Sequence, residues 1–300
     1  MLPILFTMPG NAAFGAQLSP FLPCEIGEIQ VHQFPDGESC PRLLTPVAQR
    51  DVVFACALDQ PDGKIMALYL AACIARELGA CSVGFVIPYL PYMRQDARFK
   101  EGEGITSVHF ARLISSCCDW IVTVDPHLHR HHDLSDIYRI NTEVVHAAPE
   151  ISKWIVDNID RPVVIGPDQE SEQWVAQVAN AAGCPYTVLQ KKRSGDHDVE
   201  VSIPDTATWQ GMTPVLVDDI ISTARTMIAA AQQIKLAGMK PPVCIGVHPL
   251  FVGDAYAALS AAGVERIVSC NTVEHVSNQI NVCQAIATAV KTLVGVRPYI

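Results

Sequence analysis

Positive charge is scarce in this sequence. Lys and Arg together number 21 against 31 Asp and Glu, which gives a net charge of −10 over 300 residues. Nucleic acids and anionic membrane surfaces are bound by clustered Lys and Arg side chains. The composition therefore argues against both kinds of partner, and it favours small molecules, metal ions or other copies of the same chain.

Long apolar runs and cysteine motifs are also missing. No apolar run approaches the roughly 20 residues that a membrane-spanning helix requires, and residues 1–8 lack the basic start of a targeting sequence. The 11 cysteines show neither a C-x-x-C motif nor paired spacing. We therefore expect a cytoplasmic protein whose cysteines are reduced and lie mostly in the core.

What the sequence does contain is a regular alternation of apolar patterns. Runs typical of buried strands lie at 51–57, 81–88, 120–124, 162–165, 186–189, 214–217, 243–247 and 266–269. Apolar residues three and four apart predict helices at 64–78, 105–117, 171–182, 226–237 and 253–261. This alternation predicts an α/β fold of mainly parallel sheets flanked by helices. The length suits two such domains of about 150 residues, and we expect 149–160 to connect them.

The segment 215–226 (VLVDDIISTART) carries the strongest functional signal. A buried strand leads into two acids, a small-residue loop and the start of a helix, where unpaired N–H groups and the helix dipole attract a phosphate. Asp218 and Asp219 lie where open α/β sheets place their ligands, and paired carboxylates there can bind ribose hydroxyls or Mg²⁺. Helix capping would explain the Ser and Thr residues but not the adjacent acids. We interpret the segment as a phosphoribosyl site.

A second candidate site lies at 88–107, between a predicted strand and a predicted helix. The segment contains Arg94, Arg98 and Lys100, together with Gly102 and Gly104. Arg offers bidentate contacts to phosphate oxygens and Lys a movable point charge, and the glycines allow a loop to close over a substrate. An ordinary solvated loop would have the same composition, so both interpretations stay open.

Polar residues follow three further strands. His127, in the sequence Asp125-Pro126-His127, ends one of them and Asp168 ends another, and an imidazole and a carboxylate can share an Mg²⁺ engaged by phosphates. Lys191, Lys192 and Arg193 end the third, either as surface charges or as stabilisers of a transferring phosphoryl group. The remaining histidines of the cluster lack partners with zinc-ligand spacing, so we expect surface or structural roles for His129, His131 and His132.

Together these segments resemble the ribose-phosphate diphosphokinases, also called phosphoribosyl diphosphate synthetases, over nearly the full length. The marks of the resemblance are, in chain order, FPDGE at 34–38, RQD at 94–96, GITS at 104–107, Asp125 to His127, Pro167-Asp168, Lys191 to Arg193 and the loop 218–226. The resemblance implies two domains of the type I phosphoribosyltransferase fold. Residues 1–146 are expected to bind ATP, and residues 147–300 are expected to bind ribose 5-phosphate.

The resemblance also implies a role for each marked residue. Adenine would be held, across a subunit interface, by Phe34, Asp36 and Glu38. Other contacts to ATP would come from Arg94, Gln95, Asp96, Arg98 and Lys100. Mg²⁺ would be held by His127 and Asp168, and the transition state would be stabilised by Lys191 and Arg193. Ribose 5-phosphate would be bound by Asp218, Asp219, Ser222, Thr223, Ala224, Arg225 and Thr226.

The implied reaction moves the diphosphoryl group of Mg·ATP to the anomeric hydroxyl of ribose 5-phosphate, in a homo-oligomer, and yields phosphoribosyl diphosphate and AMP. Three departures from the family pattern are present, and those at residue 225 and at residues 169–171 keep a noncatalytic function open. Arg225 stands where relatives usually carry Gly, Ser222 where many carry Asp, and Gln169-Glu170-Ser171 where most carry a Gly pair. A phosphoribosyltransferase that consumes phosphoribosyl diphosphate is one alternative. A noncatalytic homologue that regulates a true synthetase is the other.

Overall fold

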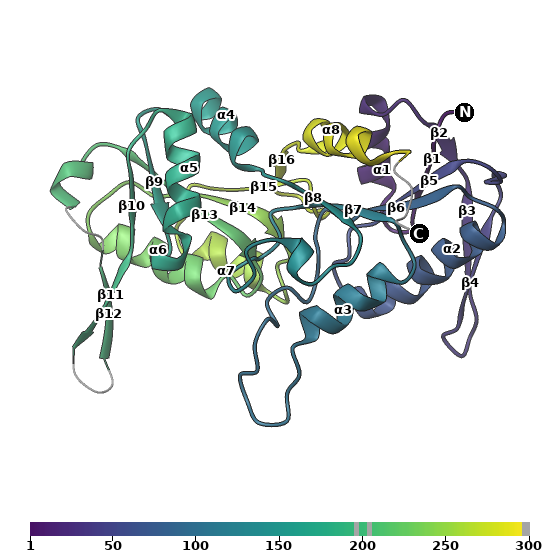
Figure 1. The fold of residues 1–300 in the computed structure, drawn as a ribbon. Helices are drawn as coiled ribbons and strands as arrows, with labels where there is room; N and C mark the ends of the chain where they lie inside the picture. Colours follow the sequence, from purple (N-terminus) through teal and green to yellow (C-terminus); the bar gives the residue numbers. More distant parts are fainter. Residues whose placement is uncertain (195–197, 203–205, 296–300) are drawn as a thin grey trace. The chain divides into compact units, whose positions relative to one another are not determined.

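The computed structural model describes residues 1–194, 198–202 and 206–295 and has an α/β architecture (Figure 1). The chain divides into two compact units. The first unit contains Met1–Val145, Thr272–Glu274 and the segment from Cys283 onward, and the second contains His146–Asn271 and His275–Val282. Each unit is built around one sheet of six strands.

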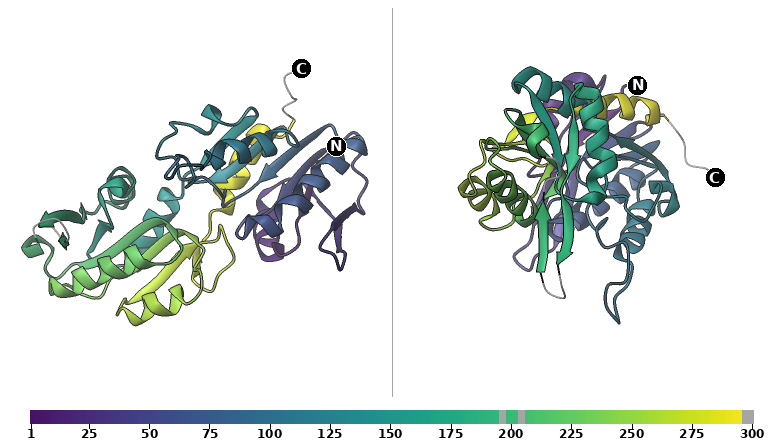
Figure 2. Two further views of the ribbon diagram at one scale, coloured as in Figure 1. Left: turned by 90° about the horizontal axis from the view of Figure 1, so that it is seen from below. Right: turned by 90° about the vertical axis from the view of Figure 1, so that its left-hand side faces the viewer.

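The sheet of the first unit is parallel throughout. Its strands, in spatial order, are β2 (Glu25–Gly27), β1 (Ile4–Thr7), β5 (Asp51–Ala55), β6 (Ser82–Val86), β7 (Trp120–Val124) and β8 (Asn141–Val145). One face is covered by α1 (Ala12–Leu18) and α8 (Cys283–Leu293), and the other by α2 (Ile65–Glu77) and α3 (Thr106–Ser115), as Figures 1 and 2 show. Because both faces are covered, all residues of β6 and β7 are buried.

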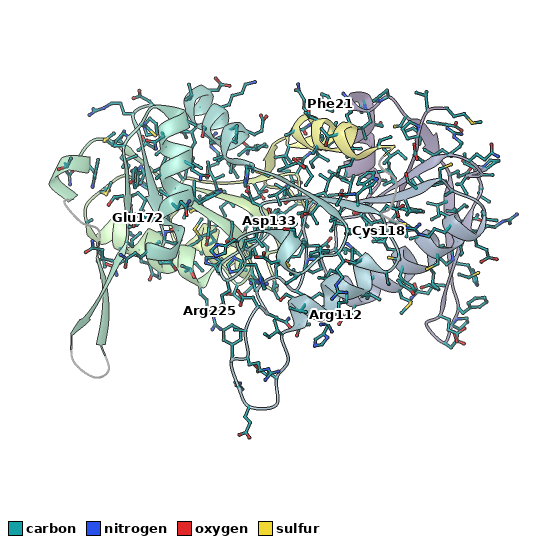
Figure 3. All side chains as sticks on the ribbon, in the orientation of Figure 1. Phe21, Arg112, Cys118, Asp133, Glu172 and Arg225 are labelled. Carbon is teal, nitrogen blue, oxygen red and sulfur yellow. The ribbon has the colours of Figure 1, made fainter. Side chains whose placement is uncertain are left out.

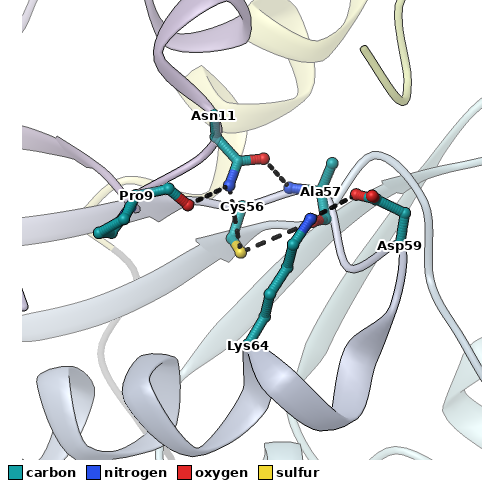
Figure 4. A network of polar contacts seen from close by, with 6 residues as sticks. All are labelled: Pro9, Asn11, Cys56, Ala57, Asp59 and Lys64. Carbon is teal, nitrogen blue, oxygen red and sulfur yellow. Dashed lines mark hydrogen bonds and ion pairs between the residues drawn. The ribbon is translucent and has the colours of Figure 1, made fainter. Parts of the chain in front are cut away.

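A partly buried polar network lies at the carboxyl end of β1 and β5 (Figure 4). The Asn11 side chain accepts a hydrogen bond from the N–H of Ala57 at 2.7 Å and donates one to the carbonyl of Pro9 at 3.1 Å. The Lys64 ammonium donates to the carbonyl of Ala57 at 3.1 Å and to the carboxylate of Asp59 at 2.6 Å. These bonds satisfy backbone groups that burial would otherwise leave unpaired.

The sheet of the second unit repeats the plan. Its strands, in spatial order, are β10 (Tyr186–Val188), β9 (Pro162–Gly166), β13 (Thr213–Ile221), β14 (Val243–Pro249), β15 (Arg266–Cys270) and β16 (Asn278–Ile280), all parallel. The helices α4 (Ala148–Asn158) and α5 (Glu172–Ala182) cover one face, and α6 (Arg225–Leu236) and α7 (Ala255–Ala261) cover the other (Figure 1). The long β13 therefore lies inside the sheet, and its end leads directly into α6.

Two antiparallel hairpins stand out from the sheets (Figure 1). They are formed by β3 (Ile29–Gln33) with β4 (Ser39–Leu43) in the first unit, and by β11 (Gln190–Ser194) with β12 (Asp198–Ser202) in the second. Short 3₁₀ turns lie at Ser19–Phe21, Pro61–Gly63, Leu134–Asp136, Gln169–Ser171 and Thr206–Trp209.

The predicted α/β class and parallel sheets are confirmed, and every strand and helix expected from the apolar pattern is present within a few residues. Two features differ from expectation. Residues 149–160 are mostly the helix α4, whose first turn contains Pro149, and α8 belongs to the first unit rather than to the C-terminal one. Among the helices of the described residues, none is long and apolar enough to cross a membrane.

Candidate active site

The loop from Ser222 to the start of α6 presents free backbone donors. In the part of the chain that the structure describes, no acceptor bonds the N–H groups of residues 222–225. Ala224, the N-cap residue, has φ +57°, a left-handed conformation that is uncommon for residues other than Gly. Its side chain gives no cap. The loop therefore offers a row of N–H groups and the positive end of a 12-residue helix to an anion.

The carbonyl groups of the same loop are engaged by the segment after β14. The N–H groups of Leu250 and Phe251 each donate to the carbonyl of Ile221 at 3.0 Å, and the N–H of Val252 donates to the carbonyl of Ser222 at 3.0 Å. Gly246 lets β14 approach closely, because a Cβ there would lie 2.6 Å from the Ile221 side chain. The loop is thus held from its carbonyl side while its N–H side stays available.

Three carboxylates gather beside this loop. Asp218 and Asp219 lie near the end of β13, which continues two residues past them to Ile221, and Asp168 follows β9, the neighbouring strand. Burial raises the pKa of Asp218 well above its ordinary range, and the charges of Asp219 and Asp168 raise it further. A carboxylate in such surroundings is stabilised by a cation or by hydrogen-bond donors, which a sugar–metal complex supplies.

Asp168 is followed by a turn that engages it. The N–H of Ser171 donates to a carboxylate oxygen of Asp168 at 3.3 Å, and the Ser171 hydroxyl donates to the Asp168 carbonyl at 2.6 Å. The turn also packs closely on β9, since a Cβ at Gly166 would lie 2.4 Å from the Ser171 hydroxyl. The three residues that depart from the usual Gly pair thus form an ordered 3₁₀ turn next to Asp168.

In the first unit, His127 follows the sharp bend at the end of β7. Asp125 is buried and has φ +31°, outside the usual range for residues with a side chain. The bend is tied to β8 by the hydrogen bond from the Asp125 N–H to the carbonyl of Val145 at 3.0 Å. The ring of His127 lies 3.8 Å from that of His129, centroid to centroid. His129 and His132 are exposed, and His131 is partly buried.

The 88–107 loop exposes its basic residues. Arg94, Arg98 and Lys100 lie on the surface, and Gln95 is exposed beside them. The carboxylate of Glu103 accepts the N–H groups of residues 99 and 100 at 2.9 and 3.0 Å, which closes the tip of the loop on itself. The loop before α3 therefore exposes positively charged side chains to solvent.

Asp96 differs from its neighbours in this loop. Its side chain is only 2% exposed and accepts a hydrogen bond from the Arg130 guanidinium at 2.7 Å. The residue predicted to contact ATP thus has its charge engaged by a cation that the sequence analysis did not single out.

The predicted adenine residues form the tip of the β3–β4 hairpin. The N–H of Phe34 donates to the carbonyl of Glu38 at 2.8 Å, and that of Gly37, which has φ +93°, donates to the carbonyl of Phe34 at 2.9 Å. Phe34 is 43% exposed and packs edge-on against His32. In the described residues no hydrogen bond or ion pair joins this tip to the basic loop.

Two predicted residues can be placed only by their backbone. Lys191 pairs with Val201 and Arg193 with Val199 in the β11–β12 hairpin. Their side chains lie outside the described part of the structure. The catalytic roles assigned to Lys191 and Arg193 therefore stay predictions.

An aromatic cluster next to the loop at residues 222–225 was not predicted. His275 stacks on Phe251, with ring centroids 4.6 Å apart, and packs against the edge of Tyr256 at 4.9 Å. Phe251 and Tyr256 lie five positions apart, but His275 comes from a distant segment of the second unit, so no local pattern in the sequence could have added it to the cluster.

Comparisons with known proteins identify the family of the two domains. The family model described as the N-terminal domain of ribose phosphate pyrophosphokinase matches residues 3–117, and the phosphoribosyl transferase domain matches residues 135–284. A ribose-phosphate pyrophosphokinase of Methanopyrus kandleri is 33% identical over 97% of this chain and 99% of its own. One from Methanothermobacter thermautotrophicus is 32% identical over 88% of this chain and 91% of its own.

The fold also matches a solved structure. The crystal structure of phosphoribosylpyrophosphate synthetase from Mycobacterium smegmatis superposes with a TM-score of 0.84 over 98% of this chain and 99% of that one, at 19% identity. The two parallel sheets, together with the phosphoribosyl transferase domain matched at residues 135–284, define an enzyme of the phosphoribosyltransferase fold class. Within that class, the chain belongs to the ribose-phosphate pyrophosphokinase family.

Proposed function

We propose that the protein transfers the diphosphoryl group of Mg·ATP to the anomeric hydroxyl of ribose 5-phosphate, and releases phosphoribosyl diphosphate and AMP. The observation that carries the proposal is the row of N–H groups at residues 222–225. These groups donate no hydrogen bond to an acceptor in the described residues, and they follow Asp218 and Asp219 in the chain. The names of the curated relatives support the same reaction.

The sugar phosphate is bound by the second unit in this proposal. The free N–H groups, the hydroxyls of Ser222, Thr223 and Thr226 and the exposed Arg225 guanidinium surround the 5-phosphate. Figure 3 shows Arg225 at the start of α6. Asp218 and Asp219 accept hydrogen bonds from the ribose hydroxyls. Binding thereby fixes the attacking anomeric oxygen, which is the main demand of a phosphoryl displacement.

Mg²⁺ is the cofactor we assign, with His127 and Asp168 as its protein ligands. The residues suit a hard divalent cation, because Asp168 supplies carboxylate oxygens close to Asp218, whose pKa is raised by burial and then by the charges of Asp219 and Asp168. When bound, the ion would neutralise charge on the phosphate oxygens and on the departing AMP. The orienting and desolvating work remains with the chain's own side chains.

The nucleotide is assigned to residues 1–146. Arg94, Gln95, Arg98 and Lys100 bind its phosphates from the exposed loop. Phe34, Asp36 and Glu38 hold adenine at a hairpin tip that no bond joins to that loop, so a second copy of the chain completes the site. The exposed Phe34 ring suits such an interface. We therefore propose a homo-oligomer as the active form.

Chemistry proceeds by a single in-line displacement. The anomeric oxygen attacks the β-phosphorus of ATP, the bond between that phosphorus and the α,β-bridging oxygen breaks, and AMP leaves with the bonding electrons. Lys191 and Arg193 stabilise the charge that develops on the transferred group. No covalent intermediate with the protein is required.

One assay tests the proposal. The purified chain is incubated with Mg²⁺, ATP and ribose 5-phosphate, and AMP and phosphoribosyl diphosphate are quantified, with ribose 5-phosphate omitted as the control. We expect equal amounts of both products, and no AMP in the control. A noncatalytic regulator yields neither product. A phosphoribosyltransferase yields neither from these substrates, but consumes added phosphoribosyl diphosphate when a nucleobase is supplied.

A further inference from the structure

Arg130 is a cation that the family-based assignment leaves without a role. It lies three residues after His127, in the segment that follows β7, and its side chain is 55% exposed. Its Nη1 donates to the Asp96 carboxylate at 2.7 Å. Its guanidinium carbon lies 5.6 Å from the ring centroid of Phe99, within the range of a cation–π contact.

The two contacts hold the guanidinium in place but use little of its bonding capacity. An Arg side chain has five N–H donors in a planar fork. Of those on Arg130, one is given to Asp96, and no other acceptor bonds the side chain in the described residues. The remaining edge faces solvent. A pre-oriented guanidinium of this kind matches two oxygens of a phosphate at little entropic cost.

The partners of Arg130 are themselves fixed. Asp96 is buried, and its second carboxylate oxygen has no hydrogen-bond partner in the described structure, so Arg130 is the cation that compensates its charge. Phe99 is 62% exposed, and its N–H is bonded to Glu103. Both partners belong to the 88–107 loop. Arg130 therefore ties this loop to the end of β7.

The acidic residues of the 88–107 loop reduce its net positive charge, so a polyphosphate bound there would gain from a further cation. Its tip carries Glu101 and Glu103 next to Arg98 and Lys100, so the positive charge that it can offer to a polyphosphate is partly cancelled. Arg130 adds one positive charge at the base of the loop, at the carboxyl edge of the sheet where parallel α/β folds bind their ligands.

We propose that Arg130 is a phosphate-binding residue of the nucleotide site, that it contacts the polyphosphate chain of ATP, and that Asp96 and Phe99 are its positioning residues. The inference rests on the proposed function, since it names a further group of the same site. It also gives Asp96 a defined role. The buried carboxylate acts on the nucleotide through Arg130 rather than by its own contact, because its charge would repel the phosphates.

Binding measurements test the proposal without turnover. Titration calorimetry with Mg²⁺, and without ribose 5-phosphate, compares inorganic triphosphate with AMP. Because the proposed contact is to the polyphosphate chain, we expect Arg130→Gln to weaken triphosphate binding about tenfold and AMP binding less than twofold. Arg130→Lys should restore part of the loss, since it returns the charge but not the fork. Arg112→Gln, which removes a cation from the exposed face of α3 (Figure 3), should leave both affinities unchanged.

A merely structural Arg130 gives a different pattern. If Arg130 only anchors the loop, Arg130→Gln weakens AMP and triphosphate equally, and the proposal is overturned. Unchanged triphosphate affinity, or a wild-type chain that binds no triphosphate, overturns it as well. Asp96→Asn should weaken triphosphate binding in the wild type but add no further loss to Arg130→Gln, and additive losses would contradict the positioning role. A wild-type chain that binds triphosphate through Arg130 but forms no AMP would refute the proposed function alone.

Discussion

The imidazole of His275 lies flat on the ring of Phe251, with centroids 4.6 Å apart and planes inclined by 29°. The backbone N–H of Phe251 donates a hydrogen bond to the carbonyl of Ile221, and the N–H of Val252 donates one to the carbonyl of Ser222. Ser222 opens the loop whose free N–H groups bind phosphate in the proposed function. The aromatic stack is therefore linked to this loop through backbone hydrogen bonds to the carbonyls of Ile221 and Ser222.

Removing the stacked ring should weaken sugar binding. An aromatic pair contributes about 1 kcal/mol beyond its buried area, which corresponds to roughly a fivefold change in an equilibrium constant. We expect His275→Ala to raise the KM for ribose 5-phosphate about fivefold, with kcat and the KM for ATP little changed. His275→Phe should restore the wild-type KM, because it keeps the ring. Initial rates with each substrate varied in turn give the answer, and a KM increase shared by both substrates would count against this supporting role.

The same residue makes stability depend on pH. Burial lowers the pKa of His275 below its ordinary value of about 6.5, so the unfolded chain binds a proton at this site more readily than the folded one. Its contribution to stability is complete above the unfolded pKa and is lost as pH falls through the folded pKa. Melting temperatures from pH 8 to pH 5 should fall less steeply in His275→Phe than in the wild type. His132→Phe, at an exposed histidine, is the control, and equal slopes in both variants would refute the assignment.

In the absence of metal, the contribution of Asp218 to stability should depend on pH in the opposite sense to that of His275. Its pKa is raised, chiefly by burial and then by the charges of Asp219 and Asp168. The folded state therefore holds this proton to higher pH than the unfolded chain does, and stability decreases as pH rises from the unfolded pKa towards the folded one. We expect metal-free Asp218→Asn to melt above the wild type at pH 8, and the difference to shrink as pH is lowered towards 4.

The same variant reports on the cation. Asn keeps the oxygen that accepts the Asp219 N–H at 3.1 Å and removes only the charge. Mg²⁺ should raise the melting temperature of the wild type more than that of Asp218→Asn, because less negative charge remains for it to balance. Asp157→Asn, at an exposed position of α4, controls for a general loss of charge. Equal Mg²⁺ responses in the wild type and Asp218→Asn would show that the charge of Asp218 does not contribute to Mg²⁺ binding.

Arg225 opposes the dipole of its own helix. A cation in the first turn of a helix is unfavourable by about 0.3–1 kcal/mol, yet Arg225 is the first residue of α6. A phosphate at the adjacent N–H groups would turn this repulsion into attraction. We expect Arg225→Gln to raise the melting temperature of the unliganded chain slightly, and to raise the KM for ribose 5-phosphate about tenfold, because a charge-assisted hydrogen bond contributes roughly 1.5–3 kcal/mol.

The other end of α6 supplies the matched control. Lys235 lies in the last turn, where a cation is favourable. Lys235→Gln removes the same charge from the same helix, so it should lower the melting temperature slightly and leave the KM unchanged. If Arg225→Gln also leaves the KM unchanged, Arg225 crowds the loop instead of binding the substrate.

Most inner strands of both sheets could be predicted, because a strand buried on both faces has a continuous apolar run. The edge strands β2, β8 and β16 are partly exposed and were not predicted. β6 and β7 are apolar along almost their whole length, and the strand from Thr213 was recognised by the same pattern. The hairpin β3–β4 has mostly exposed or half-exposed residues, so no apolar run marks it. Residues 149–160 were expected to connect the two units, but most of them form α4, and Pro149 in the first turn of this helix is favourable.

The loop at residues 222–225, which we propose binds phosphate, could be located from the sequence because its features are local. An acid pair, small residues and a helix start lie within 12 positions of the chain. The aromatic stack of His275 on Phe251 could not be predicted from local features. His275 and Phe251 are 24 positions apart, and only the path of β15 and β16 brings their rings together. The pairing of Asp96 with Arg130 is equally non-local. The family resemblance assigned Asp96 to ATP together with its neighbours, and the structure shows that the Asp96 carboxylate is buried whereas Arg94, Gln95, Arg98 and Lys100 are exposed.

Lys191 is one of the two residues to which the proposed function assigns stabilisation of the transition state. Removing one group that stabilises developing charge typically lowers kcat about 100-fold or more, whereas ground-state sugar binding depends on the loop after β13. Lys191→Ala should therefore lower kcat by roughly that factor and change the Kd of ribose 5-phosphate less than twofold, measured by calorimetry without ATP. Lys192→Ala removes the same charge from the neighbouring position of β11 and should retain most of the activity. Equal losses of kcat and sugar affinity in Lys191→Ala, or equal losses of kcat in both variants, would contradict a catalytic role, because a group that acts only in the transition state leaves substrate binding intact.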